Sequence, residues 1–427
     1  MDDVANSAPT KAWTLYSNRQ RWIFLAILFL VSTSNYLDRN IIGILLVPIK
    51  HEFHVSDSLL GLLSGFSFAV FYAFFGLPVA LWADRGNRRT IITLALAVWS
   101  AMTICCGIAQ SFVQLALARI GVGAGESGAI PPAQSLIADY FPPERRAFAF
   151  AIFMLSASAG YLLGFVVGGQ MAVHYGWRSG FLASGIPGVG LAILTLVVLR
   201  EPRTVIGFQS VNREDFRAVL RALFAKKTFQ LSLVGLTLYF FFAYGALVFA
   251  PMFLVRVLKV PLGTVSLAYG AVVTVAAITG NLGGGYFADF LALRDVRWLS
   301  WIPAAAFTIA FPIYIGTFFC RSFALFLCLG GAGFFFLSAG LSPVFATVHL
   351  VCGAYRRAVA IACMFFSANL FGLGLGPLIT GMISDKLQPT QGVQGLRFAL
   401  LVMTASLLPT AWCFYRAGYR MPDDCEE

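Results

Sequence analysis

The sequence predicts an all-α membrane protein with twelve transmembrane helices, arranged as two repeats of six. The first observation is composition: 59% of the 427 residues are hydrophobic, only 11% are charged, and the mean hydropathy is +0.80, which is too apolar for a soluble chain. The second is twelve continuous apolar stretches, each long enough to cross about 30 Å of hydrocarbon as a helix. The third is a set of landmarks that recurs after half of the chain.

The apolar stretches give the elements in order, and the polar stretches give the boundaries. The predicted helices span 21–48, 57–82, 90–109, 112–138, 146–172, 178–199, 229–255, 263–288, 298–318, 322–349, 357–383 and 394–418. They are continuous and do not alternate with polar residues, which favours helices over barrel strands. The predicted domains are a polar N-terminal segment (1–20), a first half (21–199), a linker (200–228), a second half (229–418) and a tail (419–427). The N-terminal segment lacks the apolar core of a signal peptide.

The linker is expected to hold an amphipathic helix along the membrane surface. Asn212 is a candidate N-cap for this helix. The basic residues of this segment lie off the apolar face. Five apolar residues share that face: Phe216, Val219, Leu220, Leu223 and Phe224. We expect this helix to tether the two halves.

The net charge of +11 is explained by topology and does not call for a nucleic-acid partner. With the N-terminus inside, 21 of the 30 Lys and Arg residues fall on the cytoplasmic side. Both termini are therefore expected in the cytoplasm, and the location is expected to be a bacterial inner membrane. Two basic residues, Arg39 and Arg119, fall inside helices.

The two halves repeat each other. Arg145-Arg146 opens the fifth predicted helix as Arg356-Arg357 opens the eleventh, and spaced glycines follow both pairs. Asp84 after the second helix is matched by Asp289 after the eighth. Duplicated six-helix halves are typical of rocking transporters, which bind substrate at the midplane between the halves.

Three motifs resemble those of the major facilitator superfamily, and the resemblance covers essentially the whole chain. They are the loop Asp84-Arg85-Gly86-Asn87-Arg88-Arg89, the fourth-helix stretch Arg119-Ile120-Gly121-Val122-Gly123-Ala124-Gly125, and the fifth-helix stretch Gly160-Tyr161-Leu162-Leu163-Gly164-Phe165-Val166-Val167-Gly168-Gly169. The sequence departs from these motifs at Ala80 and Asn87, where glycines are usual, and at Phe165, where the exporter motif has proline. Within the superfamily, Asn35-Tyr36-Leu37-Asp38-Arg39 and Gly123-Ala124-Gly125-Glu126-Ser127 resemble the Spinster family. That resemblance implies movement of sphingosine-1-phosphate or lysophospholipids.

Four charged residues within predicted helices are the candidates for proton coupling. Asp38 and Arg39 are adjacent, hence about 100° apart on a helix, and each needs a partner on another helix. Arg119 and Glu126, seven residues apart on the fourth helix, can supply those partners from one face. Burial disfavours an ionised carboxylate and a nearby guanidinium favours it, so pairing in one conformation couples protonation to transport. The alternative is a static ion-pair network.

The predicted gating residues lie at the cytoplasmic helix ends. Arginines of the signature loop face acidic helix ends in the first half, and a similar group lies in the second half. The predicted gating residues of both halves are Asp84, Arg85, Arg88, Arg89, Asp139, Arg145, Asp289 and Arg294. The alternative is that these arginines serve only topology. The spaced glycines are expected to permit close helix packing.

The substrate is expected to be amphiphilic, because the first half carries the intramembrane charges while the second is aromatic. The predicted substrate-binding residues are Asn35, Tyr36, Ser127, Tyr161, Tyr239, Phe242, Ser338, Ser367 and Asn369. The alternative is a small organic anion or a drug-like compound. We expect a monomer whose partners are its substrate, protons and the surrounding membrane lipids. We expect it to bind no metal, cofactor or nucleic acid. We expect no enzymatic activity, because the four histidines form no catalytic arrangement and no nucleotide-binding motif is present.

Overall fold

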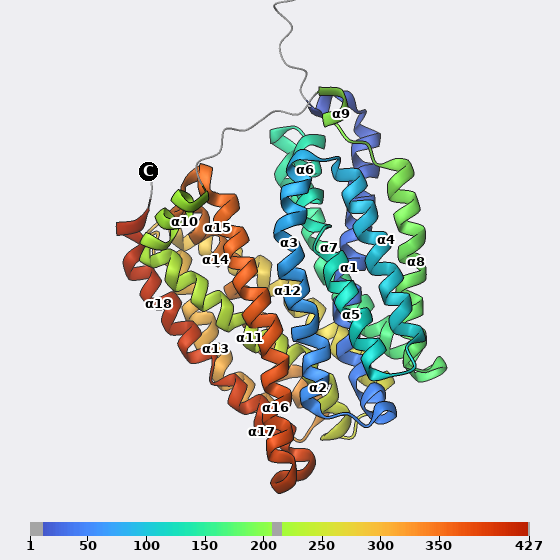
Figure 1. The fold of residues 1–427 in the computed structure, drawn as a ribbon. Coiled ribbons are helices and arrows are strands. Elements are labelled where there is room, and N and C mark those ends of the chain that lie inside the picture. Colours follow the sequence, from blue (N-terminus) through green and yellow to red (C-terminus); the bar gives the residue numbers. More distant parts are fainter. Residues whose placement is uncertain (1–11, 207–215, 426–427) are drawn as a thin grey trace, which may run out of the picture. The chain divides into compact units, whose positions relative to one another are not determined.

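The computed structural model describes residues 12–206 and 216–425, except for the side chains of Leu77, Ala80, Leu81, Asp84, Arg85, Ile206, Phe216, Ala354, Tyr355 and Ala358. This part of the chain is helical and contains no strand, as the sequence predicts (Figure 1). The N-cap predicted at Asn212 lies outside the described residues. The amphipathic helix predicted beyond it is present as α10 (Phe216–Ala225).

The helices follow the predicted stretches closely. The first half of the chain contains η1 (Ala12–Leu15), α1 (Asn18–Phe53), α2 (Asp57–Gly61), η2 (Leu62–Phe66), α3 (Ser67–Arg85), α4 (Arg88–Ile108), α5 (Phe112–Glu126), α6 (Ile130–Tyr140), α7 (Pro143–Tyr175), α8 (Trp177–Val198) and α9 (Arg203–Ile206). The second contains α10, α11 (Lys227–Arg256), α12 (Leu262–Ala292), α13 (Trp298–Phe319), α14 (Phe323–Val351), α15 (Gly353–Ser367), η3 (Ala368–Leu373), α16 (Gly374–Gln391), η4 (Gly392–Gln394), α17 (Gly395–Thr404) and α18 (Leu407–Asp424).

Nine stretches of the described chain are long and apolar enough to cross a membrane by composition alone. The difference from twelve has three causes. Polar residues such as Asp38 and Arg39 lower the hydropathy of α1, and the fourth predicted helix is broken between α5 and α6. The last two predicted helices fall within one helical stretch over Val359–Asp424.

The break in the fourth predicted helix has a local cause. Pro131 and Pro132 follow directly on the first residue of α6, and they cannot donate the backbone hydrogen bonds that would continue α5. Glu126 is consequently the last residue of α5. A carboxylate at a helix C-terminus is electrostatically unfavourable, so Glu126 needs a cation from another element.

Contacts divide the chain into two units. The first comprises residues 1–39, 71–160 and 181–212, and the second comprises 40–70, 161–180 and 213–427. Within the first unit, α4 packs against α5 and α6. Within the second, α12 and α13 pack against α14, and α18 lies beside α11 and α13 (Figure 1). The division into residues 21–199 and 229–418 stays a prediction.

Two π-helical turns interrupt the helices of the second unit. They are η2, between α2 and α3, and η3, between α15 and α16. A Cβ on Gly65 of η2 would lie 2.7 Å from the carbonyl oxygen of Leu373, the last residue of η3. The two turns therefore meet backbone to backbone at Gly65.

Candidate functional site

The charged stretch on α1 points in two directions, as its helical spacing predicts. Asp38 is fully buried, and its Oδ1 accepts a hydrogen bond from the Ser184 hydroxyl of α8. The indole of Trp99 on α4 lies beside the same carboxylate. Asp38 Oδ2 accepts no hydrogen bond among the described residues. Ser184 and Trp99 have no counterpart among the residues predicted from the sequence.

Arg39 points away from Asp38 and pairs with Glu126. Its Nη2 lies 3.0 Å and its Nε 3.3 Å from Glu126 Oε2. The Arg39 guanidinium also lies 5.0 Å from the ring centroid of Tyr72 on α3 and 5.8 Å from that of Tyr36. Desolvation offsets much of the Coulomb attraction between buried charges. A buried ion pair is therefore stable only when its contacts are short and neighbouring groups also interact with the charges. Tyr72 is a further contact that the sequence analysis missed.

Arg119 completes the cluster from α5. It is 1% exposed, and its Nη1 donates to the backbone carbonyl oxygen of Asp38 at 3.1 Å. The structure thus brings together the four charged residues that the sequence singled out. Glu126 of α5 is the expected partner of Arg39, whereas Arg119 donates to the Asp38 backbone and the Asp38 carboxylate accepts from Ser184 of α8. Their predicted role in proton coupling stays a prediction. We call Asp38, Arg39, Arg119 and Glu126 the charged cluster.

Three predicted substrate residues lie in the same unit as the charged cluster. Asn35 is 1% exposed, and neither of its side-chain polar atoms has a hydrogen bond within the described residues. Tyr36 packs closely on α7, since a Cβ on Gly160 would lie 2.3 Å from Tyr36 Cβ. The Ser127 hydroxyl donates to the carbonyl oxygen of Ala124 at 2.7 Å. These contacts define positions, and the substrate role stays predicted.

The remaining predicted substrate residues lie in the second unit, and most of them are buried. Tyr239 packs on Phe307 and Phe242 on Tyr314. Ser338 is buried beside Gly280, and Tyr161 is half-buried. The Ser367 hydroxyl lies 2.8 Å from that of Thr237. The Asn369 side-chain amide donates to the Phe365 carbonyl oxygen. Whether they contact a substrate stays a prediction.

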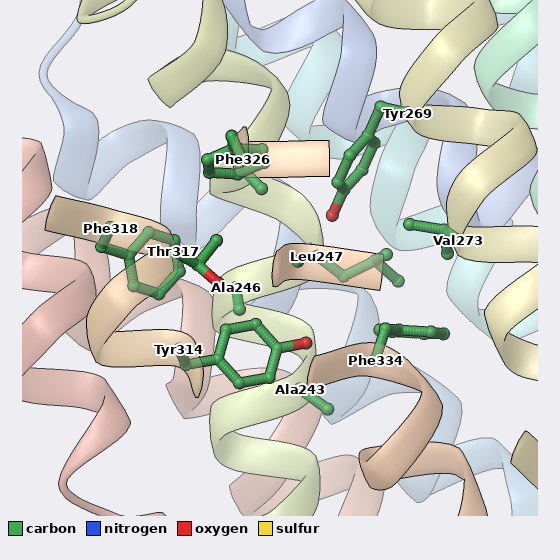
Figure 2. A pocket seen from close by; sticks show the side chains of 12 residues that line it. Ala243, Ala246, Leu247, Tyr269, Val273, Tyr314, Thr317, Phe318, Phe326 and Phe334 are labelled. Atoms are coloured by element: carbon green, nitrogen blue, oxygen red, sulfur yellow. The ribbon is translucent and has the colours of Figure 1, made fainter. Parts of the chain in front are cut away.

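A small cavity of about 20 Å³ lies among α11, α12, α13 and α14. Its lining is mostly apolar, and the hydroxyls of Tyr269 and Tyr314 point into it (Figure 2). This volume accommodates a water molecule and no larger ligand. None of the predicted substrate-binding residues lines it.

Arg88 forms the centre of a second buried ionic cluster in the first unit. Its Nη2 lies 2.6 Å from Asp139 Oδ2, and its Nη1 donates to Ser135 at 2.7 Å. Glu201 accepts from the Arg88 side chain and also from its backbone N–H at 2.7 Å. Arg88 and Asp139 both belong to the predicted gating set, whereas Glu201 was missed because it follows the last apolar stretch of the first half. Asn87 caps α4 through its side-chain oxygen and the Thr90 N–H, 3.0 Å apart.

The other predicted gating residues are less tightly held. Arg89 is half-buried and Asp289 is exposed. Arg145 donates to Asn18 at 3.4 Å, and the Arg294 guanidinium lies 5.6 Å from the ring of Phe290. The side chains of Asp84 and Arg85 lie outside the described part of the structure. The gating role of the whole set stays a prediction.

Comparison with known proteins identifies the family. A profile of the Major Facilitator Superfamily matches residues 28–377. The chain belongs to the Major Facilitator Superfamily. Superfamily relatives include an "MFS-type efflux pump" of Mycolicibacterium smegmatis, 33% identical over 413 residues, covering 96% of this chain and 95% of the relative. "Protein spinster homolog 1" of Xenopus tropicalis is 25% identical over 418 residues, covering 90% of this chain and 78% of the relative.

A solved structure of the same superfamily confirms the fold. It is the crystal structure of a bacterial homolog of the human lysosomal transporter Spinster, in an inward-facing and unoccupied conformation. Its TM-score is 0.88 at 29% identity, with 96% of this chain and 100% of that chain covered. This superfamily protein is therefore an integral, multi-pass membrane transporter that resembles the Spinster family. Within its described residues, no group of three or more His, Cys, Asp or Glu side chains is placed to hold a metal ion.

Proposed function

We propose that this protein is a proton-coupled secondary transporter of an amphiphilic, lipid-like substrate, such as a lysophospholipid or a sphingosine phosphate. It works by alternating access, with both termini in the cytoplasm of a bacterial cell. The observation that carries the proposal is the charged cluster, in which two fully buried carboxylates lie on neighbouring helices beside two arginines. Ionisable residues within membrane helices are expensive, and they generally mark transport or proton pathways.

The geometry supports proton uptake by the two carboxylates, Asp38 and Glu126, with the permanently charged arginines controlling when each carboxylate is protonated. Arg39 holds Glu126 directly, while Asp38 is held by the neutral hydroxyl of Ser184. Asp38 is thus the carboxylate better able to take up a proton without breaking an ion pair. A movement of α1 against α5 lengthens the pair of Arg39 and Glu126 and favours protonation of Glu126. Protonation then depends on the conformation, which is the requirement for coupling.

The amphiphilic substrate class rests on the chemistry of the two halves and on relatives. Arg39 offers a guanidinium flanked by two tyrosine rings, a suitable partner for an anionic head group. The second half offers aromatic residues suited to an alkyl tail. The resemblance to Spinster proteins supports the same class.

Reconstituted transport tests the proposal. Purified protein in liposomes is given a fluorescent lysophospholipid under an imposed pH gradient. The parent is expected to move the lipid faster with the gradient than without it. Asp38→Asn and Glu126→Gln are each expected to remove that acceleration, whereas Glu52→Gln, a surface carboxylate on α1, keeps it. Equal acceleration in both cluster variants overturns proton coupling at this site.

The second candidate is efflux of a drug-like compound or a small organic anion with the same coupling. It is favoured by the name of the Mycolicibacterium smegmatis relative, which is more similar to this chain than the Xenopus Spinster protein is. A competition assay separates the two candidates. Displacement of a bound lysophospholipid by other single-chain lipids, and by no soluble anion, supports the lipid. Displacement by cationic dyes or sugar acids alone supports the alternative.

A further inference from the structure

Asp57, at the start of α2, is a buried carboxylate that the charged cluster does not include. It is 0% exposed and receives two cations: Lys50 from the last turn of α1, and Arg256, whose Nη1 lies 2.8 Å from Oδ1 and 2.9 Å from Oδ2. The hydroxyl of Ser384 on α16 donates to Oδ2 at 2.6 Å. One carboxylate therefore ties the α1–α2 corner to the end of α11 and to α16.

A second carboxylate makes the reciprocal connection. Asp385 of α16 accepts the backbone N–H of Asp57 at 2.9 Å and that of Ser58 at 2.7 Å, and it also accepts the Ser58 hydroxyl. These N–H groups belong to the first turn of the helix that begins at α2 and continues through η2 into α3. Asp385 thus satisfies free N–H groups at that helix end, and its negative charge faces the positive end of the helix dipole.

The helices beneath these contacts meet at backbone distance. A Cβ on Gly381 of α16 would lie 2.2 Å from the Asp57 carbonyl oxygen, and one on Gly61 would lie 2.3 Å from that of Pro377. On the neighbouring seam, Gly43 of α1 faces Val248 of α11, 3.5 Å from an added Cβ. At Gly61 and Gly381 even a methyl group does not fit between α2 and α16.

We propose that Asp57 and Asp385, with Lys50, Ser58, Arg256 and Ser384, form a lock that holds this end of the transport pathway closed. The lock joins helices from the first six of the chain, α1 and α2, to helices from the last six, α11 and α16. When this end opens, both carboxylates lose partners from the other set of helices. The lock rests on the alternating access of the proposed function, and it adds the residues that close one end.

These contacts suit a lock because each buried charge needs its partners from the other set of helices. Removing one partner of a buried ionic group leaves the other charge buried and unpaired, which is strongly unfavourable. The closed state therefore depends on every member. In the open state the same groups reach water and recover hydration, so the lock biases the equilibrium without preventing opening.

The test measures separation of α1 from α11 with a reporter cysteine. Val248→Cys places a thiol of similar volume in the buried seam opposite Gly43, two helical turns before Arg256. A bulky, water-soluble maleimide is applied to purified protein in nanodiscs, so that both membrane faces are accessible. Protein without the reporter gives the background from the eight native cysteines.

Asp57→Asn and Asp385→Ala, each combined with the reporter, are expected to label about tenfold faster than the reporter alone. Asp385→Asn retains an acceptor oxygen, and its labelling rate is expected to lie between that of the reporter alone and that of Asp385→Ala. Gly381→Ala separates the same helices by a wedge and is expected to increase labelling with all the charges intact.

The matched control is Glu52→Gln. Glu52 makes an ionic contact at the surface near the end of α1, with Arg178 at 2.7 Å and the Trp177 indole N–H at 2.7 Å, and both partners belong to the first six helices. Its labelling is expected to stay within about twofold of the parent. The lock is overturned when monodisperse Asp57→Asn, Asp385→Ala and Gly381→Ala proteins all label at the parent rate, or when Glu52→Gln labels as fast as they do.

The labelling result is independent of the substrate. Faster labelling in the lock variants, in a protein that moves no lysophospholipid, supports the lock and contradicts the lipid substrate. Unchanged labelling in a protein that transports the lipid contradicts only the lock.

Discussion

Two adjacent residues on α1 have different electrostatic surroundings. Asp38 has a neutral hydroxyl donor, whereas Arg39 has a carboxylate and two aromatic rings. The helical angle between neighbours produces this separation, because it directs one side chain to α4 and α8 and the other to α3 and α5. Proton binding and anion binding can therefore be divided between residues that are covalent neighbours.

Tyr72 tests the aromatic contribution to this division. Replacing it with Leu removes the ring face from the Arg39 guanidinium, an interaction worth about 0.5 to 2 kcal/mol. Transport by Tyr72→Leu is expected to fall by roughly tenfold in kcat/KM. Tyr72→Phe keeps the ring face and is expected to stay near the parent. Equal losses in both variants assign the effect to the Tyr72 hydroxyl and contradict the cation–π explanation.

At the scale of single elements, α4 is fixed at its first turn by two contacts of unequal strength. Asn87 supplies an ordinary cap through its side chain. Arg88 carries a buried ionic contact to Glu201, and both side chains are 1% exposed. The cap is visible in the sequence as an Asn before an apolar stretch. Glu201 was not predictable, since it lies 113 residues from Arg88 in a polar segment.

Thermal unfolding in detergent separates these two contacts. Asn87→Ala is expected to cost about 1 kcal/mol, the usual loss of a cap. Glu201→Gln leaves Arg88 buried with only the partly exposed Asp139 as an anionic partner, and is expected to cost about 3 kcal/mol. The Tm of Glu201→Gln should be the lower of the two. Glu144→Gln, an exposed acid at the start of α7, should leave the Tm unchanged. A Glu201→Gln protein as stable as Asn87→Ala contradicts a central role for the buried pair.

For the whole molecule, apolar length and duplicated motifs predicted nearly all of the helices, because a bilayer sets a minimum helix length. The charged cluster was predictable for the same reason: charge is conspicuous within apolar sequence. Asp57, Asp385 and Tyr72 were not found. The two acids lie near polar helix ends, where charge is ordinary, and a tyrosine over a guanidinium has no sequence pattern. Their importance comes from the partners that the fold brings to them.

The polarity of α1 has a consequence for biosynthesis. This helix precedes its counter-charge in the sequence, yet its composition does not place it among the nine stretches of the described chain that are apolar enough to cross a membrane. The partner that neutralises Arg39 is synthesised 87 residues later. Nascent chains arrested before α5 is complete are therefore expected to insert α1 poorly, and longer chains efficiently, as measured by glycosylation of engineered acceptor sites. Asp38→Leu/Arg39→Leu should insert equally at both lengths, because this helix no longer waits for its counter-charges.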